Sequence, residues 1–308
     1  MRCLVTGASG HLGSFLTERL VKEGAEVFAL VRPESDLWRL ADVVDRLTII
    51  RAELDDLSSA EGQIASARAE AVFHLAWQGV TSASRHDPAQ EDNLTAGLRL
   101  FDVVRAAGCR VWIGIGSQAE YGPSEEVLTE DTPVQPLTAY GASKLKLGQL
   151  TKQLSESSGI RYVWLRLLAT YGPKDDERHL LPSAIRSLLA GEPPKLTAGE
   201  QRWDYLYVED AANAIYQTAI NKDAQGVFNL ASGETHAIRE IIEQVRDLID
   251  PSLPLELGEL PYPPDQQMRL AANIDRLITA TGWRPEVGIE QGLKRTVNWY
   301  KHHSRTVQ

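Results

Sequence analysis

The sequence predicts an α/β protein built on a doubly wound parallel sheet. Short apolar runs such as CLVT (3–6) and EVFALV (26–31) alternate with longer stretches of helical period, which is the pattern of repeated strand–helix–strand units. The runs are apolar at successive positions, so helices are expected to cover both faces of the sheet. With 308 residues, 43% of them hydrophobic, the chain can bury a large core in such a fold.

The expected elements follow one another in a regular order. A helix over 12–23 separates the first two strands, and a late apolar run, GVFNLAS (226–232), is expected to return to the sheet. The other expected elements are a strand at 47–52, a helix, a strand at 71–76, a helix over 93–107, a strand at 110–117, a helix over 139–158 and a strand at 162–169.

Charge and composition exclude several classes of protein. A net charge of -10 argues against a nucleic-acid-binding surface, and no apolar run approaches the roughly 18 residues that span a bilayer. The N-terminal MRCLVTG enters a strand at once and leaves no room for a signal peptide. Cys3 and Cys109 adjoin apolar runs and are expected to be reduced core residues. We therefore expect a cytoplasmic protein without membrane or nucleic-acid partners.

A glycine-rich turn, TGASGHLG (6–13), follows the first strand and opens the first helix. Gly7, Gly10 and Gly13 allow a close approach to the backbone, and the helix N-terminus offers free N–H groups to an anion. The spacing G-x-x-G-x-x-G is therefore interpreted as a cradle for the diphosphate of a dinucleotide in a Rossmann-type fold. The alternative is a tight strand-to-helix turn that binds no ligand.

The pattern loosens after Arg166, where proline and glycine become frequent in the segments 171–182, 188–203 and 250–267. We expect loops around short elements there. The sequence thus predicts a dinucleotide-binding domain over 1–166, with return segments near 203–231. A smaller substrate-binding lobe is expected from 167–202 and 232–308.

Three polar residues form a candidate acid–base group. Tyr140 and Lys144 in AYGASK stand four apart at the start of a predicted helix, on one face, where an ammonium favours a phenolate. Ser117 ends the preceding strand and is expected to hydrogen-bond the same reacting oxygen. Taken alone, the Tyr–Lys pair could instead be a solvated pair on a helix surface.

With these features the chain resembles the extended short-chain dehydrogenase/reductase family, the group of nucleotide-sugar epimerases, dehydratases and ketoreductases. The resemblance covers nearly the whole chain. It rests on the order and spacing of TGASGHLG (6–13), FHLA (73–76), EDNLTAG (91–97), GSQAEYG (116–122), AYGASK (139–144), LRLLATYGP (165–173), WDYLYVEDAA (203–212) and TGWRP (281–285).

The resemblance implies roles for particular residues. Ser117, Tyr140 and Lys144 take the family's catalytic places, with the lysine also binding the nicotinamide ribose, and Glu53 takes the position that contacts the adenine. The cofactor-binding residues implied are Gly7, Ser9, Gly10, His11, Leu12, Gly13, Arg32, Glu53, Leu54, Leu75, Ala76, Tyr140 and Lys144.

The resemblance also implies a nucleoside diphosphate sugar as substrate. The implied substrate-binding residues are Gln118, Tyr171, Arg202 and Arg269, with YGPKDDERHLLPSAI (171–185) covering the sugar and diphosphate. The arginine that many members carry before Asp204 is replaced by Trp203. Either Arg202 reaches the phosphate by another path or the tryptophan shapes the site.

The end of the second strand bears on the choice of cofactor. Members that keep NAD usually have an acid there, whereas this chain has Arg32, whose guanidinium can pair with a 2′-phosphate. NADP(H) is therefore the preferred cofactor, with Ser35 or Arg39 as possible helpers, and NAD(H) remains possible. The alternatives are a surface arginine, or Glu34 in the role of the missing acid.

These features favour an NADP(H)-dependent reduction of a nucleoside diphosphate 4-keto-6-deoxyhexose. The alternative is an NAD-dependent nucleotide-sugar 4-epimerase, and a non-catalytic sensor of NADP redox state is a third possibility. Dehydration is disfavoured because Gln118 and Ala119 follow Ser117 where dehydratases carry an acid pair, and Glu120 is expected to turn elsewhere. No metal site is expected, and His74 is interpreted as a packed residue. Because relatives often pair through two long helices, the resemblance implies a homodimer through the helices that begin near Asn93 and Tyr140.

Overall fold

The computed structural model describes residues 1–263 and 266–303, and its strands and helices alternate as expected. Seven strands form one parallel sheet in the order β11-β6-β5-β4-β1-β2-β3. They are β1 (Arg2–Thr6), β2 (Glu26–Val31), β3 (Leu47–Arg51), β4 (Ala71–His74), β5 (Val111–Ser117), β6 (Arg161–Leu167) and β11 (Gly226–Leu230). The α/β fold class is confirmed, and the late strand does return to the sheet, at its edge.

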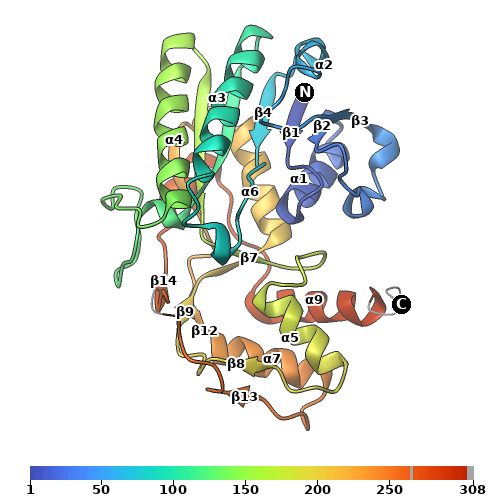
Figure 1. The fold of residues 1–308 in the computed structure, drawn as a ribbon, viewed down its shortest axis with the longest axis vertical. Coiled ribbons are helices and arrows are strands. Elements are labelled where there is room, and N and C mark those ends of the chain that lie inside the picture. The colour runs from blue at the N-terminus through green and yellow to red at the C-terminus, as the bar shows by residue number, and fades with distance from the viewer. Residues whose placement is uncertain (264–265, 304–308) are drawn as a thin grey trace.

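Helices cover both faces of this sheet. On one face α1 (His11–Lys22) packs beside α6 (Val208–Ile220), and on the other α3 (Gln90–Ala106) packs beside α4 (Ala139–Ser158), with α2 (Glu61–Ala67) next to α3 (Figure 1). Side chains of β1 alternate between the two cores. Cys3 and Val5 pack with α1 and α6, whereas Leu4 packs with α2, α3 and α4. This alternation explains why the strands are apolar at every position.

The bounds of the helices follow from their caps. The helix α4 begins after Thr138, whose hydroxyl accepts a hydrogen bond from Gly141 N at 3.0 Å, and ends at Gly159, which has φ +67°. Both bounds agree with the predicted 139–158. The helix α3 begins at Gln90, earlier than the predicted Asn93, because its acidic first turn, Glu91 and Asp92, is already helical.

A second group of elements, here called the C-terminal group, surrounds α5 (Leu180–Leu189), α7 (Ile238–Ile249) and α9 (Ile289–His303). These helices share their own apolar core, which includes Ile185, Ile241 and Leu293. In Figure 1 the group lies below the sheet, on the side of the strands' carboxyl ends. Its position brings the start of α5 close to the glycine-rich turn.

Short elements complete the described chain. They are β7 (Ala169–Tyr171), β8 (Lys195–Leu196), β9 (Arg202–Trp203), β10 (Tyr205–Tyr207), β12 (His236–Ala237), β13 (Glu256–Leu257), β14 (Arg269–Leu270) and α8 (Asp275–Thr281), with 3-10 turns at Trp38–Leu40, Val44–Arg46, Ser82–Ser84 and Gln118–Glu120. No helix within residues 1–263 and 266–303 is long and apolar enough to cross a membrane.

Candidate active site

A cleft of about 1080 Å³ opens at the carboxyl ends of the parallel strands. It lies where the strand order reverses between β1 and β4, which is the usual ligand crevice of such sheets. All the residues that were predicted to bind the cofactor line this cleft, and so do Ser117 and Gln118. The structure therefore brings together residues spread over about half of the chain, and their roles remain predictions.

The glycine-rich turn forms one wall of the cleft. Gly7 has φ +70°, and a Cβ on Gly13 would overlap the carbonyl oxygen of Gly7. Gly10 precedes α1, and no side chain caps the helix there, so the first N–H groups of α1 stay available to a ligand. This arrangement fits the diphosphate of a dinucleotide.

Tyr140 and Ser117 meet at the inner end of the cleft. Tyr140 is 9% exposed, and its hydroxyl forms a hydrogen bond with Ser117. Burial raises the pKa of Tyr140, while the hydrogen bond with Ser117 and the charge of Arg85 act in the opposite direction. In the cleft without ligands the phenol is therefore harder to ionise than in water. The sequence-based expectation was the reverse.

Lys144 makes contacts other than those expected. Its Nζ donates a hydrogen bond to the carbonyl oxygen of Ile115 at 2.7 Å and lies 4.0 Å from the centre of the Trp77 ring. Burial lowers the pKa of Lys144 to about 7, against the attraction of Glu120. Lys144 can therefore lose its charge near neutral pH. It is not the main influence on the pKa of Tyr140.

Glu120 supports Ser117 from below. Its carboxylate accepts hydrogen bonds from Ser117 N and Trp164 Nε1, both at 2.9 Å, and pairs with Arg166 Nε at 2.8 Å. Glu120 is fully buried and does not line the cleft, so it is turned away as expected. Its role in the structure is to fix the backbone of Ser117.

His74 is packed beneath the cleft. Its Nδ1 lies 2.9 Å from Thr6 Oγ1, and its ring is tilted against that of Trp112. Burial, followed by the charge of Lys144, lowers the pKa of His74 to about 3, so the ring is neutral. Thr6 in turn accepts a hydrogen bond from Ala76 N at 3.1 Å. His74 therefore helps to align the ends of β1 and β4.

The outer end of the cleft is cationic. Arg32 is exposed where β2 ends, and Arg39 follows it along the same wall. Glu34, the alternative acid, does not line the cleft, and Glu53 is the one carboxylate among the described residues that do. A protein with a net charge of -10 has thus gathered Arg32, Arg39, Arg85, Lys144 and Arg178 around one cavity. Such a cleft attracts an anionic ligand.

The sequence and the fold are similar to those of known proteins. The model of the NAD dependent epimerase/dehydratase family matches residues 3–231. The chain belongs to this family. Among curated relatives, UDP-glucose 4-epimerase of Mycolicibacterium smegmatis is 27% identical over 99% of this chain and 100% of its own length. The dTDP-glucose 4,6-dehydratase of Shigella flexneri is 25% identical over 100% and 95%.

Solved structures give the same picture. The UDP-glucose 4-epimerase of Thermus thermophilus in complex with NAD superposes with a TM-score of 0.89 at 27% identity, covering 98% of this chain and 100% of that one. A UDP-N-acetylglucosamine 4-epimerase of Methanobrevibacter ruminantium, in complex with UDP-N-acetylmuramic acid, has a TM-score of 0.89 at 28% identity over 98% of each chain.

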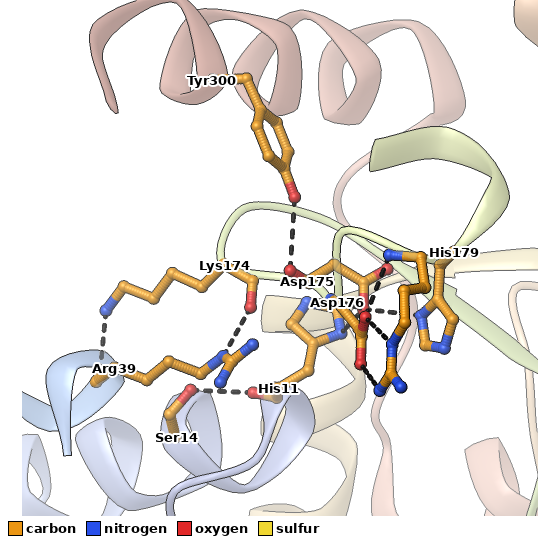
Figure 2. Close-up of polar contacts among 9 residues, drawn as sticks. His11, Ser14, Arg39, Lys174, Asp175, Asp176, His179 and Tyr300 are labelled. Atoms are coloured by element: carbon orange, nitrogen blue, oxygen red, sulfur yellow. Dashed lines mark hydrogen bonds and ion pairs between the residues drawn. The ribbon is translucent and has the colours of Figure 1, made fainter. Parts of the chain in front are cut away.

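Within this family fold, an aspartate in the loop after β7 joins distant elements (Figure 2). The carboxylate of Asp175 accepts from Nδ1 of His179 at 2.9 Å and lies 3.2 Å from Nδ1 of His11, at the glycine-rich turn. The Tyr300 hydroxyl of α9 donates to its carbonyl oxygen at 3.4 Å. Asp175 is only 6% exposed, although charged residues flank it in KDDER (174–178).

Asp175 connects the two histidines through its carboxylate. Although burial opposes it, hydrogen bonds with His11 and His179 keep the pKa of Asp175 well below its usual range. The hydrogen bond with Asp175 raises the pKa of His179. Beside this cluster, Arg39 Nε donates to Lys174 O at 2.7 Å (Figure 2). Lys174 Nζ also pairs with Glu18 of α1 at 2.7 Å. The loop is thus bonded to the wall of the cleft.

Three of the four predicted substrate-binding residues lie outside the cleft. Tyr171 is 1% exposed, packs against Gly292 and donates to Ile289 O, so it is a core residue of the C-terminal group. Arg202 is exposed on β9 and donates to Thr235 O at 3.1 Å. Arg269 lies on the neighbouring strand β14 and does not line the cleft. The three residues therefore do not line this cleft, and their substrate-binding roles stay predictions.

Trp203 lines a second cavity, of about 330 Å³, in the C-terminal group. Its Nε1 donates to Gln267 O at 2.7 Å, and its ring stacks on Tyr205. Leu180, the first residue of α5, also lines this cavity, while the preceding His179 lines the cleft. The two cavities are therefore neighbours across the start of α5. No group of three or more metal-binding side chains occurs in the described ranges.

Proposed function

We propose that this protein is a nucleotide-sugar 4-epimerase, which oxidises and reduces C4 of a nucleoside diphosphate hexose. The observation that carries the proposal is the pair of hydroxyls of Ser117 and Tyr140 at the inner end of the cleft. The glycine-rich turn lines the same cleft. The UDP-glucose 4-epimerases among its relatives support the same reaction.

The residues of the cleft fit a nicotinamide dinucleotide. The free N–H groups at the start of α1 would hold the diphosphate, and Glu53 and Leu54 would contact the adenine. Leu75 and Ala76 would lie along the cofactor, and Lys144 would bind the ribose next to the nicotinamide. When bound, such a cofactor accepts a hydride from carbon and returns it.

Proton transfer falls to the chain's own side chains. Tyr140 would take the proton of the C4 hydroxyl as the carbonyl forms, while Ser117 holds the same oxygen by a hydrogen bond. Return of the proton from Tyr140 then accompanies reduction of the opposite face of the 4-keto sugar. Because Glu120 fixes Ser117 N at 2.9 Å, the hydroxyl is held in place before the substrate arrives.

Dehydration has less support, despite the dehydratases among the relatives. Removal of water across two carbons needs a second acid–base pair beside Ser117. The next residues are Gln118 and Ala119, and Glu120 is buried in its ion pair with Arg166. No carboxylate of the described chain lies at the inner end of the cleft.

One observation favours a second candidate, the NADP(H)-dependent ketoreductase acting on a 4-keto-6-deoxyhexose. Arg32, Ser35 and Arg39 line the cleft where the ribose of the adenosine is expected, and Glu34 does not. A guanidinium there suits a 2′-phosphate. The two candidates share Ser117, Tyr140 and the substrate class, and they differ in whether the cofactor is consumed.

Two further predictions, on the substrate-binding lobe and on the oligomeric state, belong to this proposal. We propose that the C-terminal group forms the substrate-binding lobe over 167–202 and 232–308, because its helix α5 follows His179, which lines the cleft. We also propose a homodimer formed through α3 and α4, which pack side by side with half-buried leucines such as Leu98, Leu145 and Leu150 near their outer surface.

Product analysis separates these candidates. The purified protein is incubated with NAD or NADPH and with UDP-, dTDP- and GDP-linked hexoses and 4-keto-6-deoxyhexoses, and the sugars are identified by NMR. A C4 epimer without net change of cofactor supports the epimerase. Stoichiometric loss of NADPH supports the reductase. Bound cofactor and sugar with no product from any pair would contradict both.

A further inference from the structure

Arg85 lies beside the proposed catalytic tyrosine, in the segment between β4 and α3. Its carbonyl oxygen accepts a hydrogen bond from Tyr140 N at 2.9 Å, which ties this segment to the start of α4. Its guanidinium carbon lies 5.7 Å from the centre of the Tyr140 ring. Arg85 also lines the cleft together with Ser117 and Gln118. The side chain is therefore placed at the reacting end.

The guanidinium of Arg85 has no acceptor in the described chain. Its Nε is buried without a hydrogen-bond partner, and no described carboxylate forms an ion pair with it. A partly buried arginine normally satisfies its donors with a carboxylate, a carbonyl or a ligand. The contact that the structure does give this side chain is with Tyr140.

The other charged groups around Tyr140 do not supply a permanent positive charge. Lys144, on α4, is bound to Ile115 O with its Nζ 6.0 Å from the centre of the Tyr140 ring, and burial lowers its pKa to about 7. Glu120, in the turn after β5, disfavours the phenolate, and Ser117 contributes a neutral hydrogen bond. Arginine keeps its charge throughout the pH range of the protein.

We propose that Arg85 is the cation that stabilises the ionised form of Tyr140, so that it acts on the reaction through the phenol as a positioning residue. This inference rests on the proposed function for its kinetic consequence but not for its effect on the phenol. The charge of Arg85 lowers the pKa of Tyr140, after the hydrogen bond from Ser117 in size and against the larger effect of burial. The usual pairing of the phenol with Lys144 is thus supplemented by a residue from a different segment.

The kinetic test compares Arg85→Gln and Arg85→Lys with the wild-type protein. Oxidation of the sugar needs the ionised phenol, so kcat/KM rises with pH through the pKa of Tyr140. In Arg85→Gln this rise is expected about one pH unit higher, with about a tenfold loss below it and convergence with wild type above it. Arg85→Lys is expected to keep most of the wild-type profile. A structural defect would lower the rate at every pH.

A control and a second measurement complete the test. Arg295 on α9 is exposed, pairs with Glu209 and does not line the cleft, so Arg295→Gln should not move the profile. Without any substrate, ultraviolet titration of wild type minus Tyr140→Phe isolates Tyr140 among nine tyrosines. In an Arg85→Gln background its ionisation should shift to higher pH. If neither the profile nor this titration moves, the inference is wrong. If the titration moves but no sugar reacts, the proposed function has failed instead.

Discussion

The two ends of the cleft differ in how much they are exposed. At the inner end, Ser117, Tyr140 and Lys144 are all less than a tenth exposed, and burial has shifted the pKa values of the last two in opposite directions. At the outer end, Arg32 is exposed to solvent. A charge interacts more strongly where solvent is excluded. Substitutions are therefore expected to have large effects at the inner end and small effects at the outer end.

The largest effect is expected at Tyr140. Tyr140→Phe removes the proton acceptor but keeps the packing of the ring, so turnover should fall about a thousandfold while cofactor binding is unchanged. Turnover is measured by NMR of the sugar, and binding by calorimetry. Tyr216→Phe, at a half-buried ring on α6, is the matched control and should be fully active. Equal turnover in the two variants would remove Tyr140 from the mechanism.

A large loss of stability is expected beneath the same end of the cleft. Glu120→Gln leaves the guanidinium of Arg166 buried without its carboxylate, which should cost about 3 kcal/mol in the free energy of unfolding. Chemical denaturation measures this change. The double variant Glu120→Gln, Arg166→Met removes both charges and should regain part of the loss. A single variant as stable as wild type would show that the ion pair does not stabilise the fold.

At the outer end the expected effect is smaller and depends on the cofactor. Arg32→Ser removes one exposed guanidinium, so affinity for NADP(H) should fall about tenfold and affinity for NAD(H) should stay the same. Calorimetric titration of both dinucleotides measures this difference. Equal affinities for the two cofactors in wild type would reject the role of Arg32 and leave the NAD-dependent epimerase.

The smallest effect concerns the pH dependence of the Asp175 cluster. The pKa of His179 is raised in the fold, so its contribution is complete below its ordinary pKa of 6.5 and is lost as the pH rises through the folded value. The pKa of Asp175 is lowered, so the stability that this carboxylate contributes to the fold is lost only in acid. His179→Asn should therefore destabilise more near pH 6 than near pH 9, by less than about 1 kcal/mol because His179 is half exposed.

Asp176 and Arg178 also act on the pKa of His179, and His11 shares its partner Asp175. All three can therefore influence this measurement. Unfolding free energies of wild type and His179→Asn are compared at both pH values. Asp176→Asn is the control, because Asp176 is the neighbouring carboxylate and is more exposed than Asp175. A difference that is larger in base than in acid would contradict the assigned direction.

Local patterns predicted the sheet and much of the cleft. The apolar runs, the glycine-rich turn and the cap of α4 are each encoded within a few residues, so their positions could be expected from the sequence. Contacts between distant segments could not. His11 and Asp175 are far apart in the chain, as are Arg85 and Tyr140, and no periodicity signals either pair.

The C-terminal group was the hardest region to predict. Its strands are two residues long, so the side chains of Arg202 and Arg269 could not be assigned to a face by alternation. The resemblance implied that Tyr171 binds the substrate, whereas in the structure its hydroxyl donates to Ile289 O at the start of α9. The reductase prediction rested on one exposed residue, Arg32, and the relatives support the epimerase better.

The central claim is that Tyr140 takes and returns the proton of the C4 hydroxyl while a hydride is transferred at C4 of a bound nucleotide sugar. Rapid mixing of the NAD-loaded protein with UDP-glucose or UDP-galactose tests it, with the absorbance of the reduced nicotinamide as the signal. We predict a transient rise and decay in wild type that leaves the C4 epimer, and no transient in Tyr140→Phe. A transient of the same size and rate in Tyr140→Phe would contradict the account.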